Sequence, residues 1–167
     1  MVPVFIALYS SMKKKKDILL TVTLVIFAIG TLVFIRNNAA IPMYSLSQQF
    51  AQSTLSQQAT LLTNGERLLA MGAHGSVGVF PGFVLCNLSS ILLSICMIQG
   101  NVFSRKTGII GLIGTSLLLV YLILVTFVPD MKSIAMGLAA PGGILSLIWI
   151  ILYTKQLFRL STDKDSR

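Results

Sequence analysis

Four long apolar runs without a single charged residue restrict what this chain can fold into. They cover residues 18–35, 79–98, 107–128 and 134–153, and none of them contains Asp, Glu, Lys, Arg or His. A helix rises about 1.5 Å per residue, so runs of this length reach across the ~30 Å hydrocarbon core of a bilayer. Inside that core only helices or closed barrels satisfy their own backbone hydrogen bonds. The sequence therefore predicts an all-α, integral membrane four-helix bundle.

The composition agrees with a chain that lies mostly in the membrane. Of its 167 residues, 54% are hydrophobic and 11% are charged, and the mean hydropathy is +0.84. Such a chain has little polar sequence left for a soluble domain. We expect a single membrane domain over residues 1–167, with a partial or interfacial helix at 1–12, an outer loop at 36–78 and a cytoplasmic tail at 154–167.

The net charge of +8 follows the positive-inside pattern and does not indicate a nucleic-acid partner. Because successive spans alternate in direction, the basic residues fall on two sides of the membrane. One side carries Lys13, Lys14, Lys15, Lys16, Arg105, Lys106, Lys155, Arg159, Lys164 and Arg167, and the other carries Arg36, Arg67 and Lys132. The richer side is predicted to be cytoplasmic, with both termini on it. There the four consecutive lysines are interpreted as an anchor beside the headgroups of membrane lipid.

The apolar segment 1–12 is too short to cross a bilayer by itself. Two interpretations are equally open. It is either the end of a membrane helix whose beginning is missing, or an interfacial helix that lies along the inner leaflet.

The outer loop is predicted to be amphipathic and helical. Leu46 and Phe50 stand four residues apart, the spacing of one helix face. Two pairs fit the capping-box pattern, and each predicts a helix start near its threonine: Thr54 with Gln57, and Thr63 with Glu66. The pair Asn64-Gly65, which directly follows Thr63, is typical of a turn.

Residues that could carry catalysis or hold a metal are few. His74 is the only histidine and is interpreted as a solvated loop residue. Cys86 and Cys96 are about 15 Å apart along one predicted helix, too far for a disulfide, so both are expected to be free thiols. Two cysteines and one histidine do not make a metal centre. We predict no catalytic residue, no cofactor and no metal, and hence no enzyme.

Asn87 is the only strong amide in the predicted spans. Hydroxyl groups accompany it on the second, third and fourth spans: Ser89, Ser90, Ser94, Thr115, Ser116, Tyr121, Thr126 and Ser146. These groups either line a polar path or join the helices through hydrogen bonds worth roughly 0.6 kcal/mol each. The second interpretation is favoured, because ion-coupled transporters bury an ionisable group at membrane depth and these spans contain none. Asn87, Ser90 and Thr115 are the candidate polar positions.

Small residues predict where the helices pack. Gly108 and Gly111 share one side of the third span with Thr115, which lets a neighbouring backbone come close. A short turn makes the third and fourth spans antiparallel neighbours, so Gly111 is expected to face Ala139 and Gly143.

Three further residues of the fourth span carry predictions. Pro141 removes a backbone donor and should kink or loosen the helix. Trp149 and Tyr153 lie near its inner end, where aromatic residues commonly act as interfacial anchors.

Several motifs are similar to those of a known family, and the resemblance covers nearly the whole chain. They are PMYSLSQQF at 42–50, LL at 61–62, GERLLA at 65–70, VFSRKTGIIG at 102–111 and LFRL at 157–160. They resemble the bacterial multi-pass membrane proteins grouped as domain of unknown function 4386. The resemblance implies six helices, of which the first one and a half are missing here, and a bacterial membrane location. It implies no activity, so no catalytic residue is carried over.

These features predict a non-catalytic bundle in the bacterial inner membrane, with an amphipathic extracytoplasmic loop. Its expected partners are membrane lipid and either another membrane protein or a second copy of itself. The alternative is a small transporter or channel subunit that uses Asn87 and the serine-lined surface after assembly with other helices.

Overall fold

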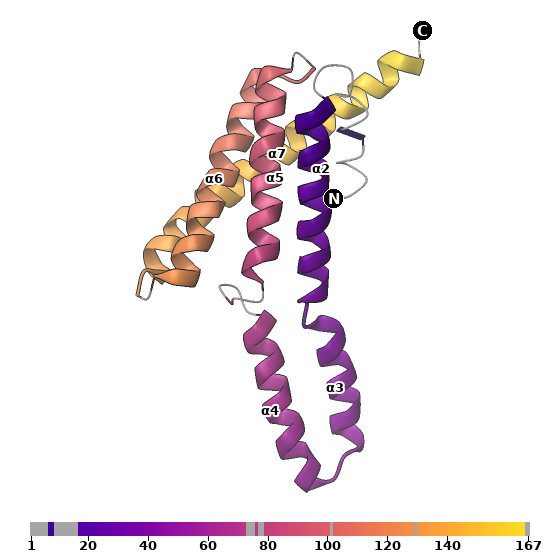
Figure 1. Ribbon diagram of the computed structural model, residues 1–167, viewed down its shortest axis with the longest axis vertical. Helices are drawn as coiled ribbons and strands as arrows, with labels where there is room; N and C mark the ends of the chain where they lie inside the picture. The colour runs from indigo at the N-terminus through magenta and orange to yellow at the C-terminus, as the bar shows by residue number, and fades with distance from the viewer. Residues whose placement is uncertain are drawn as a thin grey trace.

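The computed structural model describes residues 7–8, 17–72, 76, 79–100, 102–128 and 130–165, and almost all of them are helical (Figure 1). Six long helices make up this described part: α2 (Asp17–Arg36), α3 (Ala40–Gln52), α4 (Leu55–Gly72), α5 (Phe80–Gln99), α6 (Arg105–Phe127) and α7 (Lys132–Asp165). Four of the described helical stretches are long and apolar enough to cross a membrane, and they contain α2, α5, α6 and α7. The predicted all-α membrane bundle is confirmed.

The four membrane helices pack in the order of the sequence. α2 contacts α5, α5 contacts α6 and α6 contacts α7, whereas the described parts of α2 and α7 do not approach each other closely. Neighbours run antiparallel, so the start of α2 and the end of α7 lie at one end of the bundle, opposite the α3–α4 hairpin (Figure 1). Within the described residues, α2 and α7 therefore stand apart.

Two glycines bring α2 and α5 close together. A Cβ on Gly30 would lie 3.0 Å from the backbone nitrogen of Cys86, and one on Gly82 would lie 3.0 Å from that of Phe34. Between these helices the Ser89 hydroxyl donates a hydrogen bond to the Thr23 carbonyl, 2.9 Å away, and both residues are buried. This bond is of the interhelical kind that the sequence predicts for the membrane hydroxyls.

The core lies in the half of the bundle away from the hairpin. It joins residues of α2, α5 and α7 with Leu8, whose side chain is fully buried. Trp149 and Tyr153 belong to this core at 3% and 1% exposure, with their rings edge to face at 4.9 Å. The prediction that these two residues are interfacial anchors is wrong, because their rings pack inward against the other helices.

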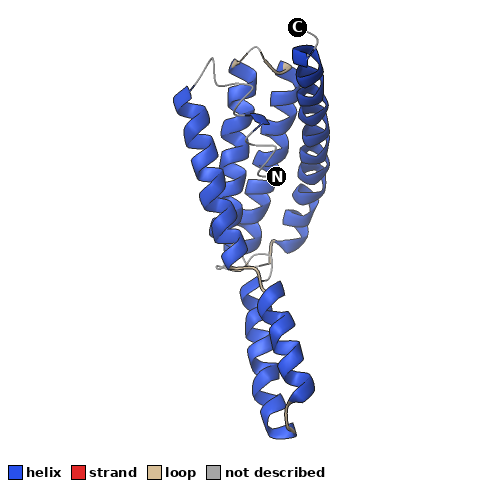
Figure 2. Cartoon of the chain, turned by 90° about the vertical axis from the view of Figure 1, so that its right-hand side faces the viewer, coloured by secondary structure: helices blue, strands red, loops and turns tan. Residues whose placement is uncertain are grey.

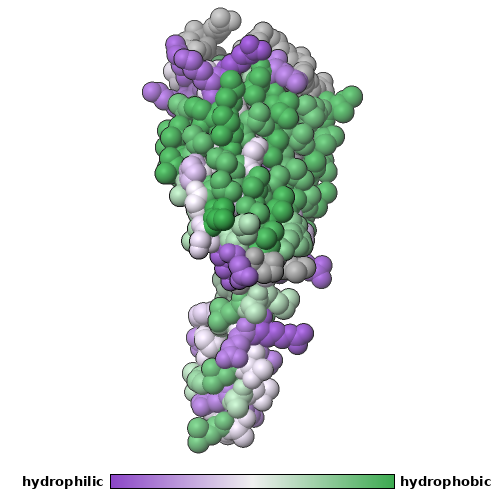
Figure 3. All heavy atoms as spheres, turned by 90° about the vertical axis from the view of Figure 1, so that its left-hand side faces the viewer, coloured by the Kyte–Doolittle hydropathy of each residue, from purple (hydrophilic) through white to green (hydrophobic). Residues whose placement is uncertain are grey.

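The outer loop forms a two-helix hairpin that projects from the bundle (Figure 2). Within the described residues α3 and α4 contact each other and no other helix. The apolar colour of the bundle gives way to a mixed polar surface on the hairpin (Figure 3). A helical hairpin with this mixed surface agrees with the amphipathic helix spacing in the sequence.

One of the two predicted helix starts in the hairpin is correct. The Thr54 backbone donates to Gln57 Oε1 at 3.2 Å, and α4 begins at the next residue. The other start is wrong, because Thr63 lies inside α4 and donates to the Ala59 carbonyl. The turn-forming pair at 64–65 does not interrupt the helix. Gly65 packs against α3 instead, where its Cβ would meet Leu46 Cδ2 at 3.3 Å.

The last helix is longer than its apolar run. α7 continues to Asp165, so most of the predicted tail at 154–167 is helical. No Gly or Pro interrupts residues 154–165, and Lys155, Gln156 and Leu157 are good helix formers. α7 also continues through Pro141 as a helix. His74, the four lysines at 13–16 and most of segment 1–12 lie outside the described residues.

Candidate functional site

A groove of about 440 Å³ lies at membrane depth where α2 and α7 stand apart. All four membrane helices contribute side chains to this α2–α7 groove. Its lining consists of Phe27, Thr31 and Phe34 of α2, Phe83, Cys86, Asn87 and Ser90 of α5, Thr115 and Leu118 of α6, and Ser146, Trp149, Ile150 and Tyr153 of α7. The groove thus combines aromatic and aliphatic walls with a small set of amide, hydroxyl and thiol groups.

Most polar side chains of the groove bond to their own helix. Asn87 Nδ2 donates to the Phe83 carbonyl at 2.9 Å, and Ser90 donates to the carbonyl of Cys86 at 2.9 Å. Thr115 and Thr31 likewise donate to carbonyls four residues earlier. The prediction of interhelical bonds is therefore wrong for Asn87, Ser90 and Thr115. In a helix without water, the carbonyl one turn back is the nearest available acceptor.

Asn87 retains hydrogen-bonding capacity in the groove. A primary amide has two donor hydrogens and a carbonyl acceptor. The structure records one bond from Nδ2 and no donor to Oδ1 among the described residues. The side chain is partly exposed and lines the groove. Because lipid chains cannot hydrogen-bond, this amide presents unsatisfied polar groups to whatever fills the groove.

The glycines of α6 make close contacts with both neighbouring helices. A Cβ on Gly108 would lie 2.9 Å from the Ser94 carbonyl oxygen of α5, and one on Gly114 would lie 2.9 Å from the backbone nitrogen of Ser146 in α7. On Gly111 it would lie 2.5 Å from Trp149 Nε1. The strip of small residues therefore lies in helix contacts and does not face lipid.

The predicted partners of Gly111 are wrong. It faces Trp149 and Ser94, whereas a Cβ on Gly143 would meet nothing within 4 Å. Gly142 is the glycine of α7 that packs on α6, with its Cβ position 3.0 Å from Leu117 Cβ. One residue is a rotation of about 100° on a helix, so a shift of one position moves a side chain from the contact to the exposed face.

Two polar atoms of α7 are buried against this glycine strip. Ser146 Oγ and Trp149 Nε1 are inaccessible and have no hydrogen-bond partner among the described residues. Their neighbours include the Gly114 and Gly111 positions, where the missing side chains leave room for them. Buried polar groups normally have hydrogen-bond partners, so the α6–α7 contact contains two polar atoms whose hydrogen bonds are not satisfied by the described residues.

The sequence pointed to part of this site. Asn87, Ser90 and Thr115 come together in the groove, while Gly108 and Gly111 pack in the adjoining helix contacts. Pro141 and Gly143 are exposed on α7 and do not line the groove. The sequence analysis did not identify Thr31, which also lines the groove. Its hydroxyl is evident in the first span, but whether it faces inward depends on how α2 is rotated about its axis.

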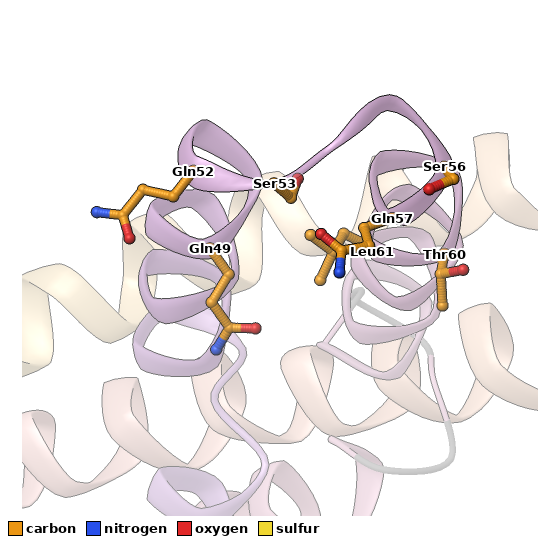
Figure 4. A pocket seen from close by; sticks show the side chains of 7 residues that line it. All are labelled: Gln49, Gln52, Ser53, Ser56, Gln57, Thr60 and Leu61. Atoms are coloured by element: carbon orange, nitrogen blue, oxygen red, sulfur yellow. The ribbon is translucent and has the colours of Figure 1, made fainter.

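The tip of the hairpin carries a hollow of about 520 Å³ lined mainly by polar side chains. In Figure 4, Gln52 points away from α4, and Ser56 and Thr60 lie on the outer side of α4. Gln57 is already engaged in the cap of α4. Because these groups do not converge, the hollow lacks the arrangement of a binding site.

No three His, Cys, Asp or Glu side chains come together within the described residues in the way a metal ion requires. Comparison with known proteins found no matching family model, no matching curated protein and no matching solved structure. The resemblance to domain of unknown function 4386 therefore stays a prediction.

Proposed function

We propose that this chain is a non-catalytic membrane bundle that binds a transmembrane helix of another protein in the α2–α7 groove. The observation that supports this function best is Asn87, an amide with an uncommitted Oδ1 in a groove that opens between two separated membrane helices. Amide side chains commonly join membrane helices through hydrogen bonds.

A helix suits the groove better than a lipid chain does. The aromatic walls formed by Phe27, Phe34 and Phe83 could pack against either occupant. Only a protein helix can bring a polar side chain to the Asn87 amide, and that bond removes the cost of leaving the amide unpaired in hydrocarbon. The proposed occupant is therefore an apolar helix with one polar residue facing the groove.

The proposal includes a location in the bacterial inner membrane with both termini in the cytoplasm. The predicted positive-inside pattern supports this orientation. Among the described residues, Arg105, Lys106, Lys155 and Arg159 lie at the end of the bundle opposite the hairpin (Figure 1). The motifs similar to domain of unknown function 4386 support the bacterial assignment. In this orientation the hairpin lies on the extracytoplasmic side.

Site-specific photocrosslinking in native membranes tests helix binding. A photoreactive residue at Leu118 points into the groove, and the same residue at Ile123 serves as the control, because Ile123 is 43% exposed on α6 outside the groove. We expect one discrete protein adduct from position 118 and none from position 123. Asn87→Leu should lower the yield of this adduct about threefold or more, because it removes one interhelical hydrogen bond. Ser116→Ala, outside the groove, should leave the yield unchanged.

The outcome that contradicts helix binding is equally specific. Phospholipid adducts alone at position 118, or a protein adduct unaffected by Asn87→Leu, would show that the amide does not hold a partner helix in the groove.

A small transporter or channel subunit is the second candidate function. One observation favours it: polar side chains from all four membrane helices line the groove, among them Thr31, Asn87, Ser90, Thr115 and Tyr153. Closure by a further helix would enclose them as a polar path. Purified protein in vesicles should then carry ions or small polar solutes faster than empty vesicles, and Asn87→Leu should reduce that flux. Equal flux with and without the protein argues against this candidate.

A further inference from the structure

A second groove lies at the end of the bundle opposite the hairpin, between the start of α6 and the last turns of α7. Its volume is about 920 Å³. It is lined by Ser104, Lys106, Thr107 and Ile110 on the α6 side, and by Leu152, Lys155, Gln156, Arg159 and Leu160 on α7. We call it the α6–α7 groove, and no residue of the α2–α7 groove contributes to it.

The α6–α7 groove is strongly basic. Lys106, Lys155 and Arg159 all belong to its lining and are exposed, and none of the described lining residues is acidic. Three like charges around one hollow raise the local positive potential, so an anion that enters it gains from all three. The charge pattern therefore points to an anionic occupant.

The N-terminus of α6 adds backbone donors to the same place. Ser104 is the N-cap residue, and no side-chain hydrogen bond caps this helix in the described structure. The side-chain amide of Gln156 binds the turn that precedes α6. Its Nε2 donates to the Val102 carbonyl at 2.9 Å, and its Oε1 accepts from the Ser104 backbone N–H at 3.4 Å. The first backbone N–H groups of α6 thus remain open to an anion.

The groove also has an apolar part on its membrane side. Ile110 and Leu152 belong to the lining, and Ile109 and Ile151 beside them are 46% and 58% exposed. A ligand that uses the whole groove must therefore be amphipathic, with an anionic head among the basic residues and a hydrocarbon part toward the bilayer. A soluble phosphate compound would leave the apolar wall uncovered.

We propose that the α6–α7 groove binds the headgroup of one anionic phospholipid. Its phosphate lies between Lys106, Lys155 and Arg159 at the N-terminus of α6, and an acyl chain passes along Ile110 and Leu152. Basic pockets between membrane helices on the cytoplasmic side are suited to such headgroups. This site is separate from the α2–α7 groove and does not depend on the function proposed for it.

Native mass spectrometry of the full chain in neutral detergent can measure the binding. Phosphatidylglycerol is titrated against phosphatidylcholine with the same acyl chains. The site variant carries Lys106→Gln, Lys155→Gln and Arg159→Gln. The matched control carries Arg36→Gln, Arg67→Gln and Lys132→Gln, which remove the same charge at described positions outside the lining.

We expect the unmodified chain to retain one phosphatidylglycerol in preference to phosphatidylcholine. The site variant should bind it about tenfold more weakly or worse, while the control should stay within roughly threefold. A Lys106→Arg, Lys155→Arg variant should bind as the unmodified chain does, which shows that the losses follow charge and not misfolding.

Three outcomes overturn the proposal. Equal losses in the site variant and the control mean that the lipid responds only to overall charge. Equal retention of both lipids means that the groove does not select an anionic head. Displacement of the lipid by soluble glycerol phosphate at comparable concentration means that the groove binds a soluble phosphate compound and the apolar wall has no part in binding.

Discussion

The indole of Trp149 occupies the space that Gly111 leaves by lacking a side chain. A Cβ at Gly111 would lie 2.5 Å from Trp149 Nε1 and 2.6 Å from Ser94 Oγ, so even one methyl group must displace a neighbour. Trp149 is 3% exposed and is packed against Tyr153, which leaves it little freedom to move. The α6–α7 contact therefore depends on the absence of a single carbon atom.

The first prediction follows from this contact. Gly111→Ala should lower the free energy of unfolding by about 1–3 kcal/mol, the usual cost of overpacking a close contact. The matched control is Gly143→Ala on α7, where the added Cβ meets nothing within 4 Å and alanine favours the helix by up to about 1 kcal/mol. Denaturation in mixed micelles measures both. Because Trp149 is the only tryptophan, its emission should also shift in the Gly111 variant. Equal stability of the two variants would contradict this packing.

The sequence predicted the membrane helices well because charge-free runs of this length have few alternatives. It also identified Gly108 and Gly111 as contact positions, since small residues in a membrane helix permit close approach. It did not predict which residue of α7 faces them. That depends on the rotation of α7 about its axis. The apolar residues of α7 are spread almost evenly around the helix, so the sequence does not indicate which side faces inward.

Tertiary packing outweighed local sequence signals in two other places. The pair Asn64-Gly65 is typical of a turn, yet α4 continues through it because Gly65 is needed for the approach of Leu46. The position of Trp149 in the span predicts an interfacial residue, whereas its burial follows from the space that Gly111 leaves on α6. The α2–α7 groove could not be predicted either, because it arises from two helices that do not meet.

The second prediction concerns the interhelical bond between Ser89 and Thr23. Ser89→Ala removes a buried hydrogen bond between α5 and α2 and leaves the Thr23 carbonyl without this donor. We expect a loss of roughly 0.6–1.7 kcal/mol in the free energy of unfolding. Ser90→Ala is the control, because Ser90 donates only to its own helix at Cys86. A loss at Ser90 as large as that at Ser89 would show that the bond between helices has no special weight.

The third prediction is that the bundle does not need the hairpin for its stability. The described parts of α3 and α4 contact only each other, and the pair is joined to the bundle near Ala39 and Gly72. Replacing residues 40–72 by a short Gly-Ser linker should leave the melting temperature of the membrane helices within a few degrees, since little apolar contact is removed from them. Circular dichroism and size-exclusion chromatography in detergent measure this. A fall of ten degrees or more, which for this chain size is several kcal/mol, would require contacts that the fold does not show.

The last prediction tests which side of the membrane carries the hairpin. Ser56 and Ser104 are both exposed and lie at opposite ends of the bundle, one at the hairpin tip and the other before α6. In a chain with Cys86→Ala and Cys96→Ala, an impermeant thiol reagent added to intact cells should label Ser56→Cys and leave Ser104→Cys unlabelled. The reason is the positive-inside pattern, which predicts a cytoplasmic location for the end that carries Arg105, Lys106, Lys155 and Arg159. Permeabilised cells are the control, because both thiols should react once the reagent can enter. Labelling of Ser104→Cys alone in intact cells would invert the orientation, and it would place the α6–α7 groove on the outer face of the membrane.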